Sequence, residues 1–279
     1  MTNADRLTER IDKHVSQLKK VGWCVVEGVI PANEVDAIRQ HVEDAHLEAT
    51  AEYEASGGAL GRQTDKDGGP GKNVISYIQP LAPYLAEQRV LGVIRTILDP
   101  HVRIAQTEFK TRPPNDDNKM YRSYHSDWPH DLSDRDRAGA VRQPFPDITM
   151  GLTTIWLLSP FGPDSGGTWI VPGSHRDPRN PRGPEDGIDE FKPITGEMQV
   201  SGPAGSVLII DSRIWHSNAA NPSDKPRVAI VARYVPWWVS VEFGGRNNAV
   251  VPRHVYEAFP ENVKPLYRHR VDGVENNIS

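Results

Sequence analysis

The hydrophobic pattern of the first hundred residues changes from helical spacing to a continuous apolar run. Four apolar residues stand three or four positions apart among charged ones, which predicts an amphipathic helix: Leu7, Ile11, Val15 and Leu18. Gly22 ends this helix, and the run over 23–30 predicts a strand. Further helices are expected from Pro31 onward and over 83–98. The glycine-rich stretch 56–72 predicts an exposed loop.

After residue 100 the pattern becomes one of short strand-like runs separated by polar, proline-containing loops. The expected strands cover 102–110, 149–158, 168–171, 206–210 and 228–235. The longest loops between them cover 112–123, 128–146 and 176–192, and long loops in a compact domain are more often functional than idle. The pattern favours an antiparallel barrel or sandwich.

The absence of internal repeats and of a clear linker predicts one domain over 1–279. Its parts are expected to be a mostly helical N-terminal portion over 1–100, a β core over 101–240 and a C-terminal cap over 241–279. In the cap, apolar residues again recur near helical spacing.

Composition narrows the class of protein. The chain has 279 residues, 37% of them hydrophobic and 25% charged, which is typical of a soluble globular protein. A formal net charge of -5 argues against nucleic-acid binding. No segment has the ~20 apolar residues of a membrane span or the pattern of a signal peptide, so we expect a cytoplasmic protein without a membrane partner. The single cysteine, Cys24, excludes an intramolecular disulfide and a cysteine-rich zinc site.

A candidate metal site begins with His125 and Asp127. Residues two positions apart on an extended strand point to the same face, so one ion could contact both side chains. His216 follows a predicted strand after a short turn and offers a third ligand. Two neutral imidazoles and one carboxylate form the facial triad that suits non-haem Fe(II) and leaves positions open for other ligands. Spacing alone leaves three other histidines as competing ligands: His130, His175 and His254.

Arg227 stands at the start of the next β-rich run after His216. A guanidinium can bind a carboxylate through two parallel hydrogen bonds. 2-Oxoglutarate carries such a distal carboxylate, and its 2-oxo acid end can chelate iron. Taken alone, Arg227 would be a surface arginine in a salt bridge; beside the candidate triad, it indicates that the metal site also takes 2-oxoglutarate.

Together with these residues, two longer motifs resemble the phytanoyl-CoA dioxygenase family, which includes ectoine hydroxylase and many oxygenases of natural-product pathways. The first is Val-Gly-Trp-Cys-Val-Val-Glu-Gly-Val-Ile over 21–30. The second is Ser-Gly-Gly-Thr-Trp-Ile-Val-Pro-Gly-Ser-His over 165–175, similar to the hairpin of the family that ends in Pro-Gly-Ser/Thr-His. Asn221 also matches, and the resemblance covers most of the chain.

The resemblance implies a double-stranded β-helix, also called a jelly roll or cupin-like barrel, with N-terminal helices packed on it. It implies Fe(II), 2-oxoglutarate and O2 as cofactors and cosubstrates. The implied iron ligands are His125, Asp127 and His216, and the implied cosubstrate contacts are Arg227, Gln106, Thr154 and Asn218. Asn218 departs from the family, which commonly has serine there, so an amide would replace a hydroxyl contact.

The reaction that the resemblance implies is hydroxylation of an unactivated C–H bond of a small metabolite or natural-product intermediate, with succinate and CO2 as coproducts. Desaturation, ring formation and epimerisation use the same cofactors. Two alternatives of other classes are a cupin-like metal hydrolase or isomerase and a non-catalytic 2-oxoglutarate-binding protein. Substrate contacts are expected from Lys110, Trp128 and Trp238. The sequence predicts no particular oligomeric state.

Overall fold

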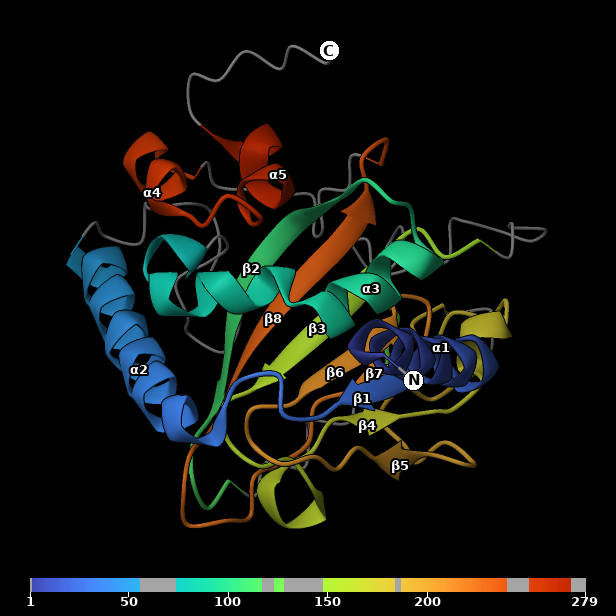
Figure 1. Ribbon diagram of the computed structural model, residues 1–279. Coiled ribbons are helices and arrows are strands. Elements are labelled where there is room, and N and C mark those ends of the chain that lie inside the picture. Colours follow the sequence, from blue (N-terminus) through green and yellow to red (C-terminus); the bar gives the residue numbers. More distant parts are fainter. Residues whose placement is uncertain are drawn as a thin grey trace.

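The computed structural model describes residues 2–55, 74–116, 123–127, 148–183, 187–239 and 251–271. In this part of the chain, two antiparallel sheets form a jelly roll (Figure 1), as the resemblance implied. The larger sheet has the order β1-β6-β3-β8-β2, with β1 (Trp23–Val26), β2 (Val102–Arg112), β3 (Leu152–Leu157), β6 (Val207–Asp211) and β8 (Arg227–Pro236). The smaller sheet has the order β5-β4-β7, with β4 (Trp169–Ile170), β5 (Met198–Gln199) and β7 (His216–Ser217).

Helices cover one face of the larger sheet (Figure 1). The α-helices are α1 (Asn3–Val21), α2 (Ala32–Ala55), α3 (Gln88–Ile97), α4 (Arg253–Ala258) and α5 (Lys264–Tyr267). Short 3-10 helices are η1 (Val74–Ser76), η2 (Gln79–Ala86), η4 (Pro163–Ser165), η5 (Ser174–Arg176) and η6 (Arg268–Arg270). In Figure 1, α1 and α3 lie side by side across the sheet, and the red helices α4 and α5 lie next to each other, with α5 against β2. These helices confirm the predicted amphipathic first helix and the helical C-terminal segment.

Two predicted elements differ from the structure. The helix expected over 83–98 is interrupted at Glu87, whose backbone is extended (φ −61°, ψ 134°). The Glu87 carboxylate accepts hydrogen bonds from the backbone N–H groups of Arg89 and Val90, so it ends η2 and caps α3. The strand expected over 23–30 ends at Val26, because the chain bends where Gly28 adopts φ +59°.

The central strands β3, β6 and β8 of the larger sheet are buried on both faces, which explains their continuous apolar runs in the sequence. All six residues of β3 are buried. Leu152 and Trp156 belong to the core between the sheet and the helices, whereas Ile155 packs in the interior of the barrel. Alternation along the strand therefore places Thr153 on the interior face with Ile155.

The long pairing of β2 with β8 sets the polar residues of the barrel interior opposite each other. Gln106 pairs with Arg233, and Arg112 pairs with Arg227. The register shifts between Ile104 and Gln106, as at a β-bulge.

In the part of the chain that the structure describes, no helix combines the length and the apolar character that a membrane span requires. The division into 1–100, 101–240 and 241–279 stays a prediction. The loop expected over 56–72 lies outside the described residues.

Candidate metal centre

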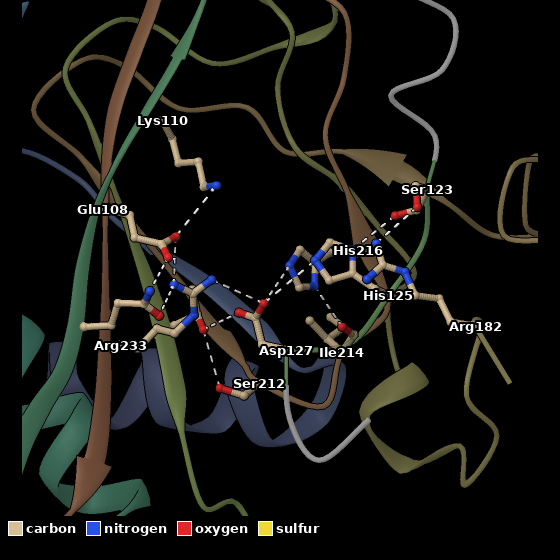
Figure 2. A network of polar contacts seen from close by, with 12 residues as sticks. Glu108, Lys110, Ser123, His125, Asp127, Arg182, Ser212, Ile214, His216 and Arg233 are labelled. Atoms are coloured by element: carbon tan, nitrogen blue, oxygen red, sulfur yellow. Dashed lines mark hydrogen bonds and ion pairs between the residues drawn. The ribbon is translucent and has the colours of Figure 1, made fainter. Parts of the chain in front are cut away.

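His125, Asp127 and His216 meet inside the barrel (Figure 2). Their nearest ligand atoms all lie within 4.8 Å of one another. Oδ1 of Asp127 lies 3.8 Å from Nε2 of His125 and 3.7 Å from Nε2 of His216. Among the described residues, this is the one group of three or more His, Cys, Asp or Glu side chains arranged to share an ion.

The backbone joins the two histidines directly. The N–H of His125 donates to the carbonyl of His216 at 3.0 Å, and the N–H of His216 donates to the carbonyl of His125 at 2.9 Å. This bridge attaches the short segment 123–127 to β7. Two ligands that are far apart in the sequence are therefore neighbours in an antiparallel pair.

A loop holds the other side of the segment 123–127. The carbonyl of Glu190 accepts the N–H of Tyr124 at 2.9 Å, and its carboxylate accepts the hydroxyl of Ser123 at 2.7 Å. Arg182 contacts both groups, with Nε 3.1 Å from the Glu190 carboxylate and a terminal nitrogen 3.1 Å from the Ser123 hydroxyl. The segment that carries His125 is thereby fixed from both sides.

Each imidazole is fixed in the tautomer that a metal needs. Nδ1 of His125 lies 3.0 Å from the carbonyl of Ser123, and Nδ1 of His216 lies 3.0 Å from the carbonyl of Ile214. A carbonyl oxygen only accepts, so each Nδ1 carries the hydrogen and each Nε2 presents a lone pair towards Asp127. Burial, followed by the charges of His216 and Arg182, holds the pKa of His125 well below its usual value, so this imidazole is neutral.

Asp127 has a different partner on each carboxylate oxygen. The Thr153 hydroxyl donates to Oδ2 at 2.6 Å, and a terminal nitrogen of Arg233 lies 3.4 Å from Oδ1. Burial by itself would raise the pKa of Asp127, but the charge of Arg233 and the Thr153 hydrogen bond hold it far below the usual range. The carboxylate is ionised, and with the two imidazoles it fits Fe(II).

One cavity joins the metal ligands to Arg227. It is lined by the three candidate ligands and by ten more residues: Lys110, Thr153, Ile155, Phe161, Thr168, Asn218, Arg227, Ala229, Val231 and Arg233. Arg227 is buried and donates from Nη1 to the carbonyl of Gly166 at 2.8 Å, and its guanidinium lies 4.8 Å from the centre of the Phe161 ring. The structure thus brings Lys110, Asn218 and Arg227 to the cavity of the metal ligands.

Gln106 and Thr154 do not line this cavity. The Gln106 side chain contacts Glu108 and Arg233 instead. Thr154 points to the opposite face of β3, where its hydroxyl donates to the carbonyl of Ala232 at 2.8 Å and accepts from Nε1 of Trp156 at 2.9 Å. The assignment of Thr154 as a cosubstrate contact therefore gains no support from the structure, because strand alternation turns its neighbour Thr153 towards the cavity instead.

The remaining sequence-based candidates either lie away from the cavity or fall outside the described residues. Trp238 is 48% exposed and does not line the cavity, so its assignment to the substrate gains no support. Trp128 and the competing ligand His130 lie outside the described residues. His175 packs near the end of α1, and His254 is exposed on α4, so neither joins the metal group.

Sequence reasoning missed Thr153, Glu108 and Arg233. Glu108 does have a sequence signal, since polar or charged residues recur at every second position from Gln106 to Arg112, inside a run that reads as a buried strand. Arg233 stands six positions after Arg227 and therefore on the same face of β8.

A jelly roll that gathers two imidazoles and one carboxylate is the arrangement of non-haem iron oxygenases. The family model described as Phytanoyl-CoA dioxygenase (PhyH) matches residues 18–229. The chain therefore belongs to the phytanoyl-CoA dioxygenase family, whose members are iron- and 2-oxoglutarate-dependent oxygenases. The family, fold, enzyme class and cofactors predicted from the sequence are thereby confirmed.

Individual relatives are more distant. The chain is 25% identical to the ectoine dioxygenase of Stutzerimonas stutzeri over 276 residues, which covers 90% of this chain and 85% of that protein. A match of 33% identity to an uncharacterized protein of Mycobacterium tuberculosis spans 95 residues, 33% of this chain and 32% of that protein. The fold is similar to EctD from S. alaskensis with 2-oxoglutarate and 5-hydroxyectoine bound, with a TM-score of 0.57, 22% identity, and coverage of 83% of this chain and 79% of that one.

Proposed function

We propose that the protein uses Fe(II), 2-oxoglutarate and O2 to hydroxylate an unactivated C–H bond of a small metabolite or natural-product intermediate. The coproducts are succinate and CO2. His125, Asp127 and His216 hold the iron. The observation that carries the proposal is that a buried arginine and this ligand set line one cavity. When bound, iron and 2-oxoglutarate supply the oxidising chemistry, and the protein supplies position and charge.

Arg227 binds the distal carboxylate of 2-oxoglutarate in this proposal. Its guanidinium is held by the Gly166 carbonyl and the Phe161 ring, so it is oriented before the cosubstrate arrives. Ala229 and Val231 lie on the same face of β8 between Arg227 and the metal end of the cavity. Their apolar side chains suit the methylene groups of 2-oxoglutarate and exclude water beside them.

Two further polar groups of the cavity complete the proposed contacts. The Asn218 amide, two positions after His216, replaces the serine hydroxyl of the family as a cosubstrate contact. Lys110 lies on β2 with its ammonium 3.7 Å from the Glu108 carboxylate and offers a positive charge to an anionic group of the substrate. Gln106 reaches the site only through Arg233.

The presence of Arg227 in the same cavity as the candidate metal ligands favours an oxygenase over a hydrolase or isomerase. A metal that only activates water does not need an arginine that binds the carboxylate of a cosubstrate. Desaturation, ring formation and epimerisation share the cofactors and differ in their product. Hydroxylation adds one oxygen atom to the substrate. A reaction in isotopically labelled O2 identifies it, because the label then appears in the product.

The cytoplasmic location expected from the sequence is part of the same proposal.

The test measures 2-oxoglutarate binding and substrate-dependent succinate release by anaerobically loaded protein. Arg227→Gln is expected to keep its metal and to weaken 2-oxoglutarate binding at least tenfold, because a charge-assisted pair is lost. Lys225→Gln is the matched control, since that cation is exposed two positions away and lies outside the cavity. Equal 2-oxoglutarate affinity in Arg227→Gln and wild type would refute the assignment of the arginine.

A further inference from the structure

Arg233 connects the proposed metal ligand Asp127 to a second carboxylate, that of Glu108 (Figure 2). Its side chain is largely buried, with 12% exposed. One terminal nitrogen, Nη1, lies 3.0 Å from the Glu108 carboxylate and 3.0 Å from the Gln106 amide oxygen. The other terminal nitrogen, Nη2, lies 3.4 Å from Oδ1 of Asp127. The guanidinium therefore spans two anions on opposite sides.

Strand pairing supplies the partners of Arg233. Gln106 stands directly opposite Arg233 in the β2–β8 register, immediately after the register shift, and Glu108 is the next residue on the same face. Both partners project from a paired strand, so they hold the guanidinium on a rigid support. Lys110, one step farther along the same face, also contacts the Glu108 carboxylate.

The distances indicate which contact dominates. Arg233 lies closer to Glu108 and Gln106, at 3.0 Å, than to Asp127, at 3.4 Å. The guanidinium is therefore anchored on β2 through Nη1, and only Nη2 reaches Asp127. The shortest bond of Asp127 is the one from Thr153 to Oδ2, at 2.6 Å. This arrangement fixes Oδ2 and leaves Oδ1, which faces both imidazoles, to act as the metal-binding atom.

We propose that Arg233, anchored by Glu108 and Gln106, is a positioning residue that orients Asp127 as a ligand through Oδ1. The inference rests on the proposed function only for the identity of the metal ligands. A guanidinium suits the role because its planar fork reaches Glu108 and Asp127 at once, whereas a lysine ammonium is a single point of charge. Outer partners of metal ligands typically change metal affinity about 10–100-fold when they are removed.

The variants separate orientation from charge. Arg233→Lys keeps the positive charge but cannot bridge both carboxylates. The double variant E108Q/R233Q removes one charge of each sign, so the net charge of the site is unchanged while the bridge is lost. Arg233→Gln alone removes a cation that repels the metal. The half-buried ion pair between Glu87, which caps α3, and Arg89 on α3 offers a matched control, E87Q/R89Q, away from the cavity.

The measurement is a titration of the metal-free full chain with Co(II), followed by its visible absorption, with Fe(II) competition under anaerobic conditions. We expect Arg233→Lys and E108Q/R233Q to bind Co(II) about tenfold or more weakly and with an altered spectrum, which a merely structural role would not produce. E87Q/R89Q should bind like wild type. Wild-type affinity in Arg233→Lys together with tighter binding in Arg233→Gln would mean that Arg233 acts through charge alone, which overturns the proposal.

Two further outcomes are informative. If the double variant is unfolded, Glu108→Gln alone, which leaves Arg233 less firmly anchored, must weaken Co(II) binding, and wild-type affinity in that variant overturns the proposal. The titration contains neither 2-oxoglutarate nor substrate. A failure of wild type to bind 2-oxoglutarate would therefore contradict the proposed function and leave the positioning role of Arg233 standing.

Discussion

Gly22 packs directly against the imidazole of His175. A Cβ atom on Gly22 would lie 2.7 Å from Nδ1 of His175. Gly22 ends α1 with φ +87°, and His175 belongs to η5, in which the Ser174 hydroxyl accepts the N–H of Trp215 at 2.8 Å. Trp215 precedes His216, so the end of the first helix supports the strand that carries a proposed metal ligand.

Gly22→Ala should therefore lower stability. The added methyl group meets His175, and the left-handed backbone is strained for alanine, which together should cost about 1–3 kcal/mol in the free energy of unfolding. Gly28→Ala is the matched control, because Gly28 also has positive φ (+59°) but nothing lies within 4 Å of its added Cβ. Urea unfolding measures both. Equal losses in the two variants would contradict the role of the His175 contact.

Thr153 and Thr154 offer a test of strand alternation at neighbouring positions. Thr153→Val removes the hydrogen bond to Asp127 and should weaken Fe(II) binding about 10–100-fold. Thr154→Val leaves Nε1 of Trp156 without its acceptor and should cost about 1–3 kcal/mol of stability without changing metal affinity. Metal titration and thermal unfolding of both variants check the prediction. Weaker metal binding in Thr154→Val would contradict the assignment of faces.

The neighbours Thr153 and Thr154 also show which features of the site the sequence alone could not predict. The three candidate metal ligands and Arg227 could be proposed from the sequence, because His-x-Asp and a strand-initial arginine indicate chemistry without knowledge of register. Thr153 could not be chosen over Thr154, because both faces of β3 are buried and hydrophobic alternation is lost. The link from Gln106 and Glu108 to Arg233 depends on a register shift in β2. Tertiary pairing creates that link, and no local pattern specifies it.

His269 should make the fold sensitive to acid. Burial, and then the charges of Arg103 and Arg270, lower the pKa of His269 from 6.5 to about 3. Between these values the unfolded chain binds a proton that the folded chain excludes, so this residue reduces stability as pH falls from about 6.5 towards 3. In His269→Gln, the free energy of unfolding should fall less steeply over this range. Urea unfolding at several pH values measures the slope, and an unchanged slope would contradict the prediction.

Cys24 should be inert to alkylation in the folded protein. It lies fully buried on β1, and burial raises the pKa of its thiol to about 12, so the reactive thiolate is scarce at neutral pH. Mass spectrometry after iodoacetamide treatment should find no adduct on native protein and one adduct per chain in urea. An adduct on the native protein within minutes would mean that β1 separates readily from β6.

The backbone pairing of His125 with His216 also bears on how the protein acquires its metal. Peptide hydrogen bonds already join the two imidazole-bearing segments, and Thr153 already orients Asp127. An ion that binds here meets two imidazoles whose backbone segments are joined by peptide hydrogen bonds, so the fold itself brings these candidate ligands together. The candidate metal site is therefore part of the hydrogen-bonded framework of the barrel rather than an appended loop.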